Sequence, residues 1–278
     1  MTKLHNISVL MAVHNKVEAS ILHEALESIH RQTLQPKQII LVEDGRLNKH
    51  LKRVIAKWRW VWRHRLTTVH NHKNLGLTAS LNRGLKLARY PLIARMDSDD
   101  IAHPKRFELQ VSFLAQHPEI AILGGAIEEF DNTAIRHTRH YPLSHEEVIL
   151  SIHRASPLAH PAVMMRREIF RGGLRYDERY RTSQDIALWF DAIAAGYRIA
   201  NLQEIVLYYR LDDSTFRRRA AQKAWDEFSI YCRGIRQLHG LLSWRYIYPL
   251  ARFITRLMPS PIIRHLYHGN LRKMVIQQ

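Results

Sequence analysis

The sequence has one cysteine, few glycines and prolines, and no long uncharged apolar run, and each shortage excludes a class of protein. Its 278 residues include 11 Gly, 10 Pro and the single cysteine Cys232. One cysteine forms no internal disulfide and no cysteine-based metal site, so nothing indicates an oxidising compartment. With 46% hydrophobic residues, the composition also excludes collagen-like repeats and disorder. The chain is long enough to bury a sizeable core in one domain or slightly more.

Membrane-spanning and secreted proteins are excluded by two further absences. No window reaches about 18 consecutive uncharged apolar residues, the minimum for a spanning helix. The apolar run at residues 7–13 is too short for a signal peptide and has no small-residue cleavage site behind it. We therefore expect a cytoplasmic protein.

Acidic residues are scarce compared with basic ones. The chain has 42 Lys and Arg against 25 Asp and Glu, a formal charge of +17. Residues 217–278 alone contribute +10, because twelve basic residues there stand against Asp226 and Glu227. Such a surplus indicates a polyanionic partner: nucleic acid, anionic lipid or a phosphorylated substrate.

Strand-length apolar runs alternate with helical patterns over the first hundred residues. Strands are expected at 7–13, 38–43, 66–69 and 91–96, and helical patterns at 19–32, 54–62 and 77–87. This alternation predicts an α/β fold with a mostly parallel sheet covered by helices on both faces. Ligands bind such sheets beyond the carboxyl ends of the strands, where polar residues stand here at 14–15, 43–44 and 97–100.

The pattern becomes less regular after residue 100. We expect a helix from Pro104 to Gln116, then two strands at 120–123 and 126–130 joined through Gly124 and Gly125. Ser144 with Glu147 forms a capping box for a short helix, and Ser183 begins another that Gly196 ends. The simplest division is a catalytic domain at 1–216 and a helical extension at 217–278.

Three aspartates follow the apolar strand at 91–96. Alternate residues of an extended segment point the same way, so Asp97 and Asp99 are expected to face one cleft, with Asp100 beside them. Closely spaced carboxylates suit Mg²⁺ or Mn²⁺, which bridge to substrate phosphates. The alternative is an acidic turn that caps the next helix.

Five segments in order carry a family resemblance. They are Val-Leu-Met-Ala-Val-His-Asn at 9–15, Val-Glu-Asp-Gly at 42–45, Asn-Leu-Gly-Leu at 74–77, Leu-Asn-Arg-Gly at 81–84 and Ala-Arg-Met-Asp-Ser-Asp-Asp at 94–100. Over residues 7–216 the chain resembles family 2 glycosyltransferases, which have the Rossmann-like GT-A fold. It is most similar to bacterial enzymes that extend a lipid-linked oligosaccharide for O-antigen, capsule or exopolysaccharide, many of which form β-1,3 linkages.

The resemblance implies inverting transfer from a nucleotide sugar, usually a UDP-sugar. The nucleotide-binding residues implied by the matching motifs are Ala12, Val13, His14, Asp44, Asn74, Gly76 and Asn82. Among these, Asp44 would accept the uracil N–H, and glycine permits close approach of the backbone to the ligand.

The resemblance also implies a cation site for Mn²⁺ or Mg²⁺, which would stabilise the departing diphosphate. Asp99 is expected to ligate the metal, and Asp97 to meet the ribose, the metal or a metal-bound water. Asp212 stands where relatives often have a late histidine ligand. Arg95 would support the diphosphate or donor sugar, or equally form an ordinary ion pair with a neighbouring aspartate.

The base that deprotonates the acceptor hydroxyl is expected to be Asp185. The family has a Glu-Asp pair at the start of a late helix, and Gln184 replaces its first acid here. Without the resemblance, Asp185 would equally be an acid that complements the helix dipole. His160 matches a histidine near the acceptor, although a lone histidine is more often structural. The Gln-x-x-Arg-Trp pattern of processive synthases is absent, so we expect one sugar to be added per encounter.

The C-terminal segment has the pattern of an interfacial helix. Arg245, Arg252 and Arg256 share one face of a possible helix, and the apolar residues of the other face are Ile247, Leu250, Phe253, Ile254 and Leu257. Basic residues, an apolar stripe and flanking aromatics predict peripheral association with the inner face of an anionic membrane. The alternative is a helix packed on the catalytic core with a solvated basic face. No nucleic-acid-binding motif accompanies the charge, so a nucleic-acid partner is not expected.

Two other functions remain as hypotheses. A sugar nucleotidyltransferase also binds nucleotides on an α/β sheet, but His14-Asn15-Lys16 lacks the usual Gly-rich phosphate loop. A non-catalytic protein that binds anionic lipid or nucleic acid through its tail would need no nucleotide sugar.

Overall fold

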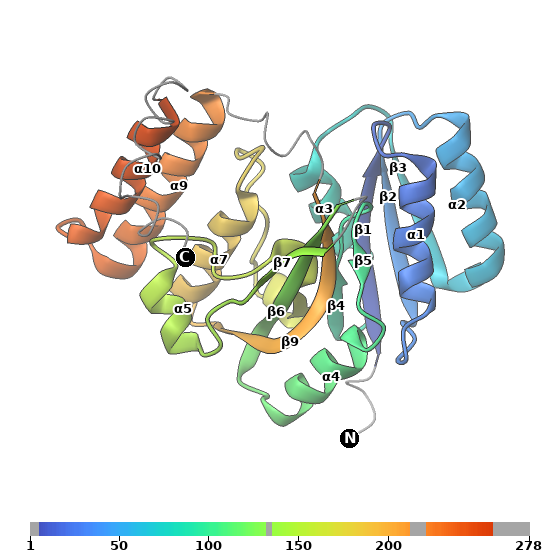
Figure 1. The fold of residues 1–278 in the computed structure, drawn as a ribbon, viewed down its shortest axis with the longest axis horizontal. Coiled ribbons are helices and arrows are strands. Elements are labelled where there is room, and N and C mark those ends of the chain that lie inside the picture. Colours follow the sequence, from blue (N-terminus) through green and yellow to red (C-terminus); the bar gives the residue numbers. More distant parts are fainter. Residues whose placement is uncertain (1–5, 132–134, 212–220, 258–278) are drawn as a thin grey trace.

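The computed structural model describes residues 6–131, 135–211 and 221–257, which form a nine-stranded sheet with helices on both faces (Figure 1). The strand order is β3-β2-β1-β4-β8-β6-β9-β5, and β7 pairs with β6 outside this path. Six of these nine described strands run in one direction, and β5, β7 and β8 run against them. The expected α/β class with a mostly parallel sheet is therefore confirmed.

The elements keep close to the expected positions over the first hundred residues. The strands are β1 (Ile7–His14), β2 (Gln38–Asp44), β3 (Leu66–Asn71), β4 (Leu92–Arg95), β5 (Ile101–Ala102), β6 (Ile120–Phe130), β7 (Ile135–Arg139), β8 (Met164–Arg166) and β9 (Arg198–Arg210). The helices are α1 (Ala19–His30), α2 (Lys49–Trp62), α3 (Leu77–Leu85), α4 (Arg106–Gln116), α5 (His145–Ser151), α6 (Glu168–Arg171), α7 (Gln184–Ala194), α9 (Ala221–His239) and α10 (Ile247–Leu257). Short 3-10 turns are η1 (Arg63–Arg65), η2 (His160–Ala162) and η3 (Trp244–Tyr246).

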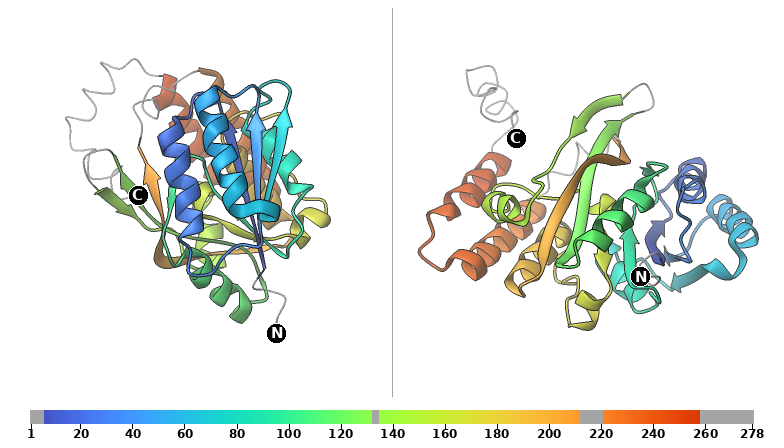
Figure 2. Two further views of the ribbon diagram at one scale, coloured as in Figure 1. Left: turned by 90° about the vertical axis from the view of Figure 1, so that its right-hand side faces the viewer. Right: turned by 90° about the horizontal axis from the view of Figure 1, so that it is seen from below.

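Alternating side chains of the buried strands divide the core between the two faces of the sheet. In β1, Val9 and Met11 belong to the cluster that contains residues of α1 and α2. Leu10 points to the other face and packs with α3 and α7. Figure 2 shows α1 and α2 side by side over one face of the strands. Such two-sided burial explains why the strands read as continuous apolar runs.

Helix α3 lies unusually close to the sheet because of Gly84. A Cβ atom at this position would come within 2.3 Å of Leu10 Cδ1 and 3.1 Å of Val42 Cγ2. The close contact holds α3 against β1 and β2, so its first residue, Leu77, lies beside the carboxyl ends of these strands.

The two strands expected at 120–123 and 126–130 are one continuous strand, β6. The glycines do not end the strand, because they let β9 approach it closely: a Cβ at Gly124 would be 2.0 Å from Asn201 Oδ1. The pairing of β6 with β9 shifts register at Gly125 and Ala126, which indicates a bulge. Two other strands, β8 and β9, were not expected from the sequence.

The C-terminal helices α9 and α10 lie at the far end of the molecule from α1 and α2 (Figure 1). Ile230 and Tyr231 of α9 belong to the same core cluster as Phe190 of α7. A helical extension is thus confirmed, and it shares a core with the rest of the chain. The boundary expected at 216/217 lies outside the described residues, so the division at that point stays a prediction.

The arginines of α10 are directed towards α9 rather than towards solvent. Arg252 and Arg256 both form ion pairs with Glu227, at 2.9 and 2.6 Å. The exposed stripe of α10 is uncharged instead, with Ile247 and Ile254 exposed by 61% and 46%. The alternative of a solvated basic face is therefore wrong for these two arginines. Arg245 precedes α10, in η3, and the Leu257 side chain lies outside the described residues.

Within the described ranges, no helix combines the length and apolar character needed to cross a bilayer.

Candidate active site

A cavity of about 450 Å³ lies where the carboxyl ends of β1, β2 and β4 converge. Its walls are the ends of β1 and β2, residues 97–100 after β4, residues 181–184 at the start of α7, and the end of β9. Its volume is within the range typical of small-molecule sites. The predicted site residues that line it are Ala12, Val13, His14, Asp44, Asp97 and Asp99.

The acidic cluster forms one group of possible metal ligands. Asp97, Asp99 and Asp100 each offer a carboxylate oxygen, and these oxygens lie within 4.8 Å of one another. Asp97 is partly buried, Asp99 is exposed and Asp100 is fully buried. Three hard oxygen ligands around one point suit a divalent cation such as Mg²⁺ or Mn²⁺.

Asp100 supports this interpretation through an atom that lacks a partner. Its Oδ1 accepts a hydrogen bond from the Arg210 backbone N–H at 3.0 Å, but its buried Oδ2 has no hydrogen-bond partner. Burial raises the pKa of Asp100 well above its usual value, and the charges of Asp97 and Asp99 add to the effect. A cation would relieve both the repulsion and the unsatisfied oxygen, so these residues fit a divalent metal.

Arg95 is buried behind the cluster and forms an ion pair with Asp97. Two hydrogen bonds, at 2.6 and 2.9 Å, join its guanidinium to the Asp97 carboxylate, and its side chain is only 2% exposed. The ion pair, which was one of the two expectations for Arg95, is confirmed. Its role towards a diphosphate stays a prediction, because Arg95 is not part of the cavity wall.

Asp44 organises the loop that leads into α3. Its carboxylate accepts hydrogen bonds from Asn71 Nδ2 and from the backbone N–H groups of Leu75 and Gly76, at 2.7 to 3.0 Å. Gly76 has a φ of +89°, which favours glycine, and Asn74 donates to the Asp44 carbonyl oxygen. Asn74 and Gly76 thus lie next to Asp44 behind the cavity wall, and their roles towards a nucleotide stay predictions.

Asn82 anchors the loop before α7. Its Nδ2 donates to the Tyr176 carbonyl oxygen and to Glu178 Oε1, and its Oδ1 accepts from the Tyr176 N–H. One turn earlier, Thr78 donates to the Tyr180 carbonyl oxygen. The structure thus gives Asn82 a positioning role for the loop that carries residues 181–184 to the cavity. Its expected contact with a ribose stays a prediction.

The start of α7 forms the wall opposite the nucleotide motifs. Ser183 precedes the helix with a left-handed φ of 58° and does not cap it through its side chain. Gln184 is buried and lines the cavity, and its Oε1 has no hydrogen-bond partner. An unpartnered polar atom in a cavity wall is suited to a ligand hydroxyl. Neither sequence pattern nor composition assigned Gln184 a definite role.

Asp185, next to Gln184, lies behind this wall and is partly buried. Burial raises the pKa of its carboxyl group, and the charge of Asp97 also raises it, whereas Arg95 lowers it. The predicted base and the predicted metal ligands therefore share one electrostatic environment. A carboxylate with a raised pKa is a stronger base than an ordinary aspartate, as general base catalysis requires.

His160 is buried beside these groups. Its Nε2 lies 2.7 Å from the Tyr176 hydroxyl, and its ring packs edge-on against Trp189. Burial and the charge of Arg95 hold its pKa well below the usual value, so it is neutral. These contacts indicate a structural residue next to the site.

Two wall residues, Tyr209 and Arg210, were not expected. Arg210 at the end of β9 donates to the Asp99 carbonyl oxygen and forms an ion pair with Glu24, and it also contacts Asp100 through its backbone. The signal was the motif quoted for Asp212, which begins at Tyr208. Asp212 itself lies outside the described residues, so its expected metal ligation stays a prediction.

The family model described as "Glycosyl transferase family 2" matches residues 8–174. The "Amylovoran biosynthesis glycosyltransferase AmsE" of Erwinia amylovora is 33% identical over 261 residues, 94% of this chain and 97% of its own. The "UDP-Gal:alpha-D-GlcNAc-diphosphoundecaprenol beta-1,3-galactosyltransferase" of Escherichia coli is 31% identical and covers 96% and 97% of the two chains.

Among solved structures, a mannosyltransferase from Pyrobaculum calidifontis in complex with GDP-Man and Mn²⁺ has a similar fold. The TM-score is 0.65 at 15% identity, and the match covers 97% of this chain and 80% of that one. At this identity the likeness shows the fold alone.

Proposed function

Since the chain belongs to glycosyl transferase family 2, we propose that it transfers a single hexose from a UDP-sugar to a lipid-linked saccharide, with inversion at the anomeric carbon. The reaction would serve the synthesis of a bacterial cell-surface polysaccharide, and the linkage would be β-1,3. The observation that carries the proposal is one cavity whose walls hold both the acidic cluster and the start of α7.

The donor side is supported by the ends of β1 and β2 and by the acidic cluster. Ala12, Val13 and His14 would face the nucleoside, because they form the cavity wall where ligands bind parallel sheets. Asp97, Asp99 and Asp100 would hold Mn²⁺ or Mg²⁺, which would offset the charge of the departing diphosphate. The E. coli relative uses a UDP-sugar, as its name states, which favours uridine as the nucleoside.

The acceptor side is supported by Gln184 and Asp185. Asp185 would remove the proton of the acceptor hydroxyl, and the raised pKa of its carboxyl group suits that task. Gln184 would hydrogen-bond an acceptor hydroxyl through its unpartnered Oε1. Attack from this wall, opposite the leaving diphosphate, would invert the anomeric carbon.

A lipid-linked acceptor would bring the protein to the inner face of the cell membrane. The name of the E. coli relative specifies a diphosphoundecaprenol-linked acceptor. The exposed apolar stripe of α10 would lie in the membrane interface, where such acceptors are found. Nucleic acid would not bind, because the proposed partners account for the basic charge.

The experiment is a panel of UDP-sugars with Mn²⁺ and a lipid-diphosphate saccharide acceptor. We expect transfer from one UDP-sugar, which stops when EDTA is added. A sugar nucleotidyltransferase would instead release diphosphate from a nucleoside triphosphate and a sugar 1-phosphate. Formation of that product without any glycosyl transfer would overturn the proposal.

A further inference from the structure

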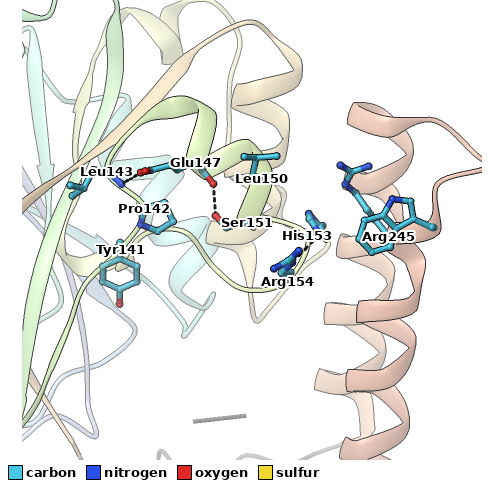
Figure 3. A pocket seen from close by; sticks show the side chains of 10 residues that line it. Tyr141, Pro142, Leu143, Glu147, Leu150, Ser151, His153, Arg154 and Arg245 are labelled. Carbon is cyan, nitrogen blue, oxygen red and sulfur yellow. Dashed lines mark hydrogen bonds between the residues drawn. The ribbon is translucent and has the colours of Figure 1, made fainter. Parts of the chain in front are cut away.

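A second cleft, of about 660 Å³, lies apart from the acidic cluster, between α5 and the C-terminal helices. Figure 3 shows Leu150 and Ser151 of α5 on one side of it and Arg245 on the other, with His153 and Arg154 between them. None of its lining residues belongs to the cavity described above.

The cleft is positively charged. Arg154 and Arg245 line it, and neither forms an ion pair with any residue that the structure describes, unlike Arg252 and Arg256, which share Glu227. The Glu147 carboxylate, also in the lining, accepts from the backbone N–H groups of residues 143 and 144 in a capping box. Two guanidinium groups thus face the cleft without a neutralising carboxylate, which favours an anionic ligand.

His153 does not weaken or strengthen this charge, because it is neutral. Arg154 Nε donates a hydrogen bond to His153 Nε2 at 3.4 Å. Burial lowers the pKa of His153 to about 4, and the charges of Arg245 and Arg154 contribute. The anion-binding capacity of the cleft therefore comes from the two arginines.

The rim of the cleft is apolar. Leu143, Leu150 and Trp244 are exposed by 43%, 62% and 60%, and Trp244 directly precedes the α10 segment with the uncharged stripe. A basic interior with an apolar rim matches an amphiphile whose charged group is followed by a hydrocarbon chain.

Tyr141 connects the cleft with the proposed base. It lines the cleft, and burial raises the pKa of its hydroxyl, with further contributions from the charges of Glu129 and Asp185. The cleft therefore opens on the acceptor side of the active site rather than on the donor side.

We propose that this cleft binds the diphosphate of the lipid-linked acceptor, with Arg154 and Arg245 on the phosphate oxygens and the apolar rim on the first part of the prenyl chain. The inference rests on the proposed function and specifies where its acceptor is held. The saccharide would then extend past Tyr141 towards Asp185.

Binding of geranyl diphosphate, a short soluble probe, tests the cleft directly. The titration is done in EDTA, so that no divalent cation can recruit the probe to the acidic cluster. Arg154→Gln and Arg245→Gln should each weaken binding about tenfold, because each removes a charge-assisted contact. Arg171→Gln, which removes an exposed arginine of α6, should leave binding unchanged. Equal affinity in all four proteins, or no binding by the unmodified chain, would overturn the proposal.

A comparison of two acceptors separates this proposal from the proposed function. One acceptor carries the lipid diphosphate, and the other is an alkyl glycoside of the same saccharide. Arg154→Gln and Arg245→Gln should raise KM about tenfold for the first acceptor only, with an unchanged KM for the UDP-sugar. Equal losses with both acceptors would contradict the cleft assignment. Absence of transfer by the unmodified enzyme would contradict the proposed function, and the geranyl diphosphate titration would still decide on the cleft.

Discussion

Asp185 combines two properties that a base needs: a position next to the cavity wall and a carboxyl group that is costly to ionise. The pKa of this group is raised mainly by burial. Because the folded protein holds the proton more tightly than the unfolded chain, stability falls as pH rises through the raised pKa, and the penalty is fully present at neutral pH. Asp185→Asn should therefore not lower the thermal midpoint at pH 7.

The same shift predicts the pH dependence of transfer. Asp185 accepts a proton only when ionised, so kcat/KM should fall as pH decreases, and the fall should begin above the value of about 4 expected for an ordinary aspartate. The measurement is a pH profile at saturating Mn²⁺. A flat profile down to pH 4 would contradict the assignment of Asp185 as the base.

The acidic cluster predicts stabilisation by a divalent cation. Mn²⁺ at about 100 times its Kd should stabilise the folded chain by about 2.7 kcal/mol, because only the folded state assembles the three carboxylates. Asp99→Ala should remove most of this increase in thermal midpoint. Glu168→Gln, an exposed acid of α6, is the matched control and should retain it. The same increase in both variants would place the cation elsewhere.

Helices and strands with a clear period were predictable, and those set by long-range pairing were not. The apolar run of β1 and the pattern of α1 depend on local sequence, so both were found within one or two residues. β6 was divided in two because the sequence does not reveal that Gly124 faces Asn201 of a distant strand. β9 was missed because its exposed and buried residues follow the bulged pairing with β6 rather than a regular alternation.

Helix α9 depends on one glycine for its contact with α7. A Cβ at Gly234 would come within 2.2 Å of the ring of Phe190, which is buried and cannot move aside. Gly234→Val should therefore destabilise the protein by about 2 kcal/mol through overpacking. Urea unfolding measures this effect, with Arg236→Val at an exposed position of the same helix as the control. Equal midpoints for the two variants would show that α9 does not pack as described.

The charge surplus of the molecule is less available at α10 than its sequence indicates. Arg252 and Arg256 are paired with Glu227, so the exposed stripe of this helix contributes apolar surface rather than charge. Which side of an amphipathic helix faces the core is decided by its tertiary partner. The sequence therefore predicted the two faces of α10 but not their direction.

Membrane binding should accordingly depend on the apolar stripe. Replacing Ile247 and Ile254 with serine should weaken binding to anionic vesicles at least tenfold, because each side chain loses about 1 kcal/mol of apolar burial in the interface. Flotation at several salt concentrations measures the effect. Leu87→Ser, at an exposed position after α3, is the control and should float as the unmodified protein does. Loss of binding in moderate salt alone, with no effect of the serine substitutions, would contradict this assignment.

The candidate site was predictable where its residues follow one another in the chain. The ends of β1 and β2 and the cluster after β4 were identified from polar residues that follow buried strands, and the structure brings them to one cavity. Arg210 and Asp100 escaped assignment, because their roles depend on the pairing of β9 with β5 and on burial. Asn82 was expected at the ribose, but its hydrogen bonds depend on a loop 94 residues away.

The most direct test is donor binding and transfer measured together in Asp185→Asn. With Mn²⁺ and the UDP-sugar selected by the panel, this variant should bind the donor as tightly as the unmodified enzyme but transfer the sugar about 1000 times more slowly. Asp191→Asn, farther along α7 and paired with Arg233, should transfer normally. Transfer at the unmodified rate by Asp185→Asn would show that the proton is removed by another group.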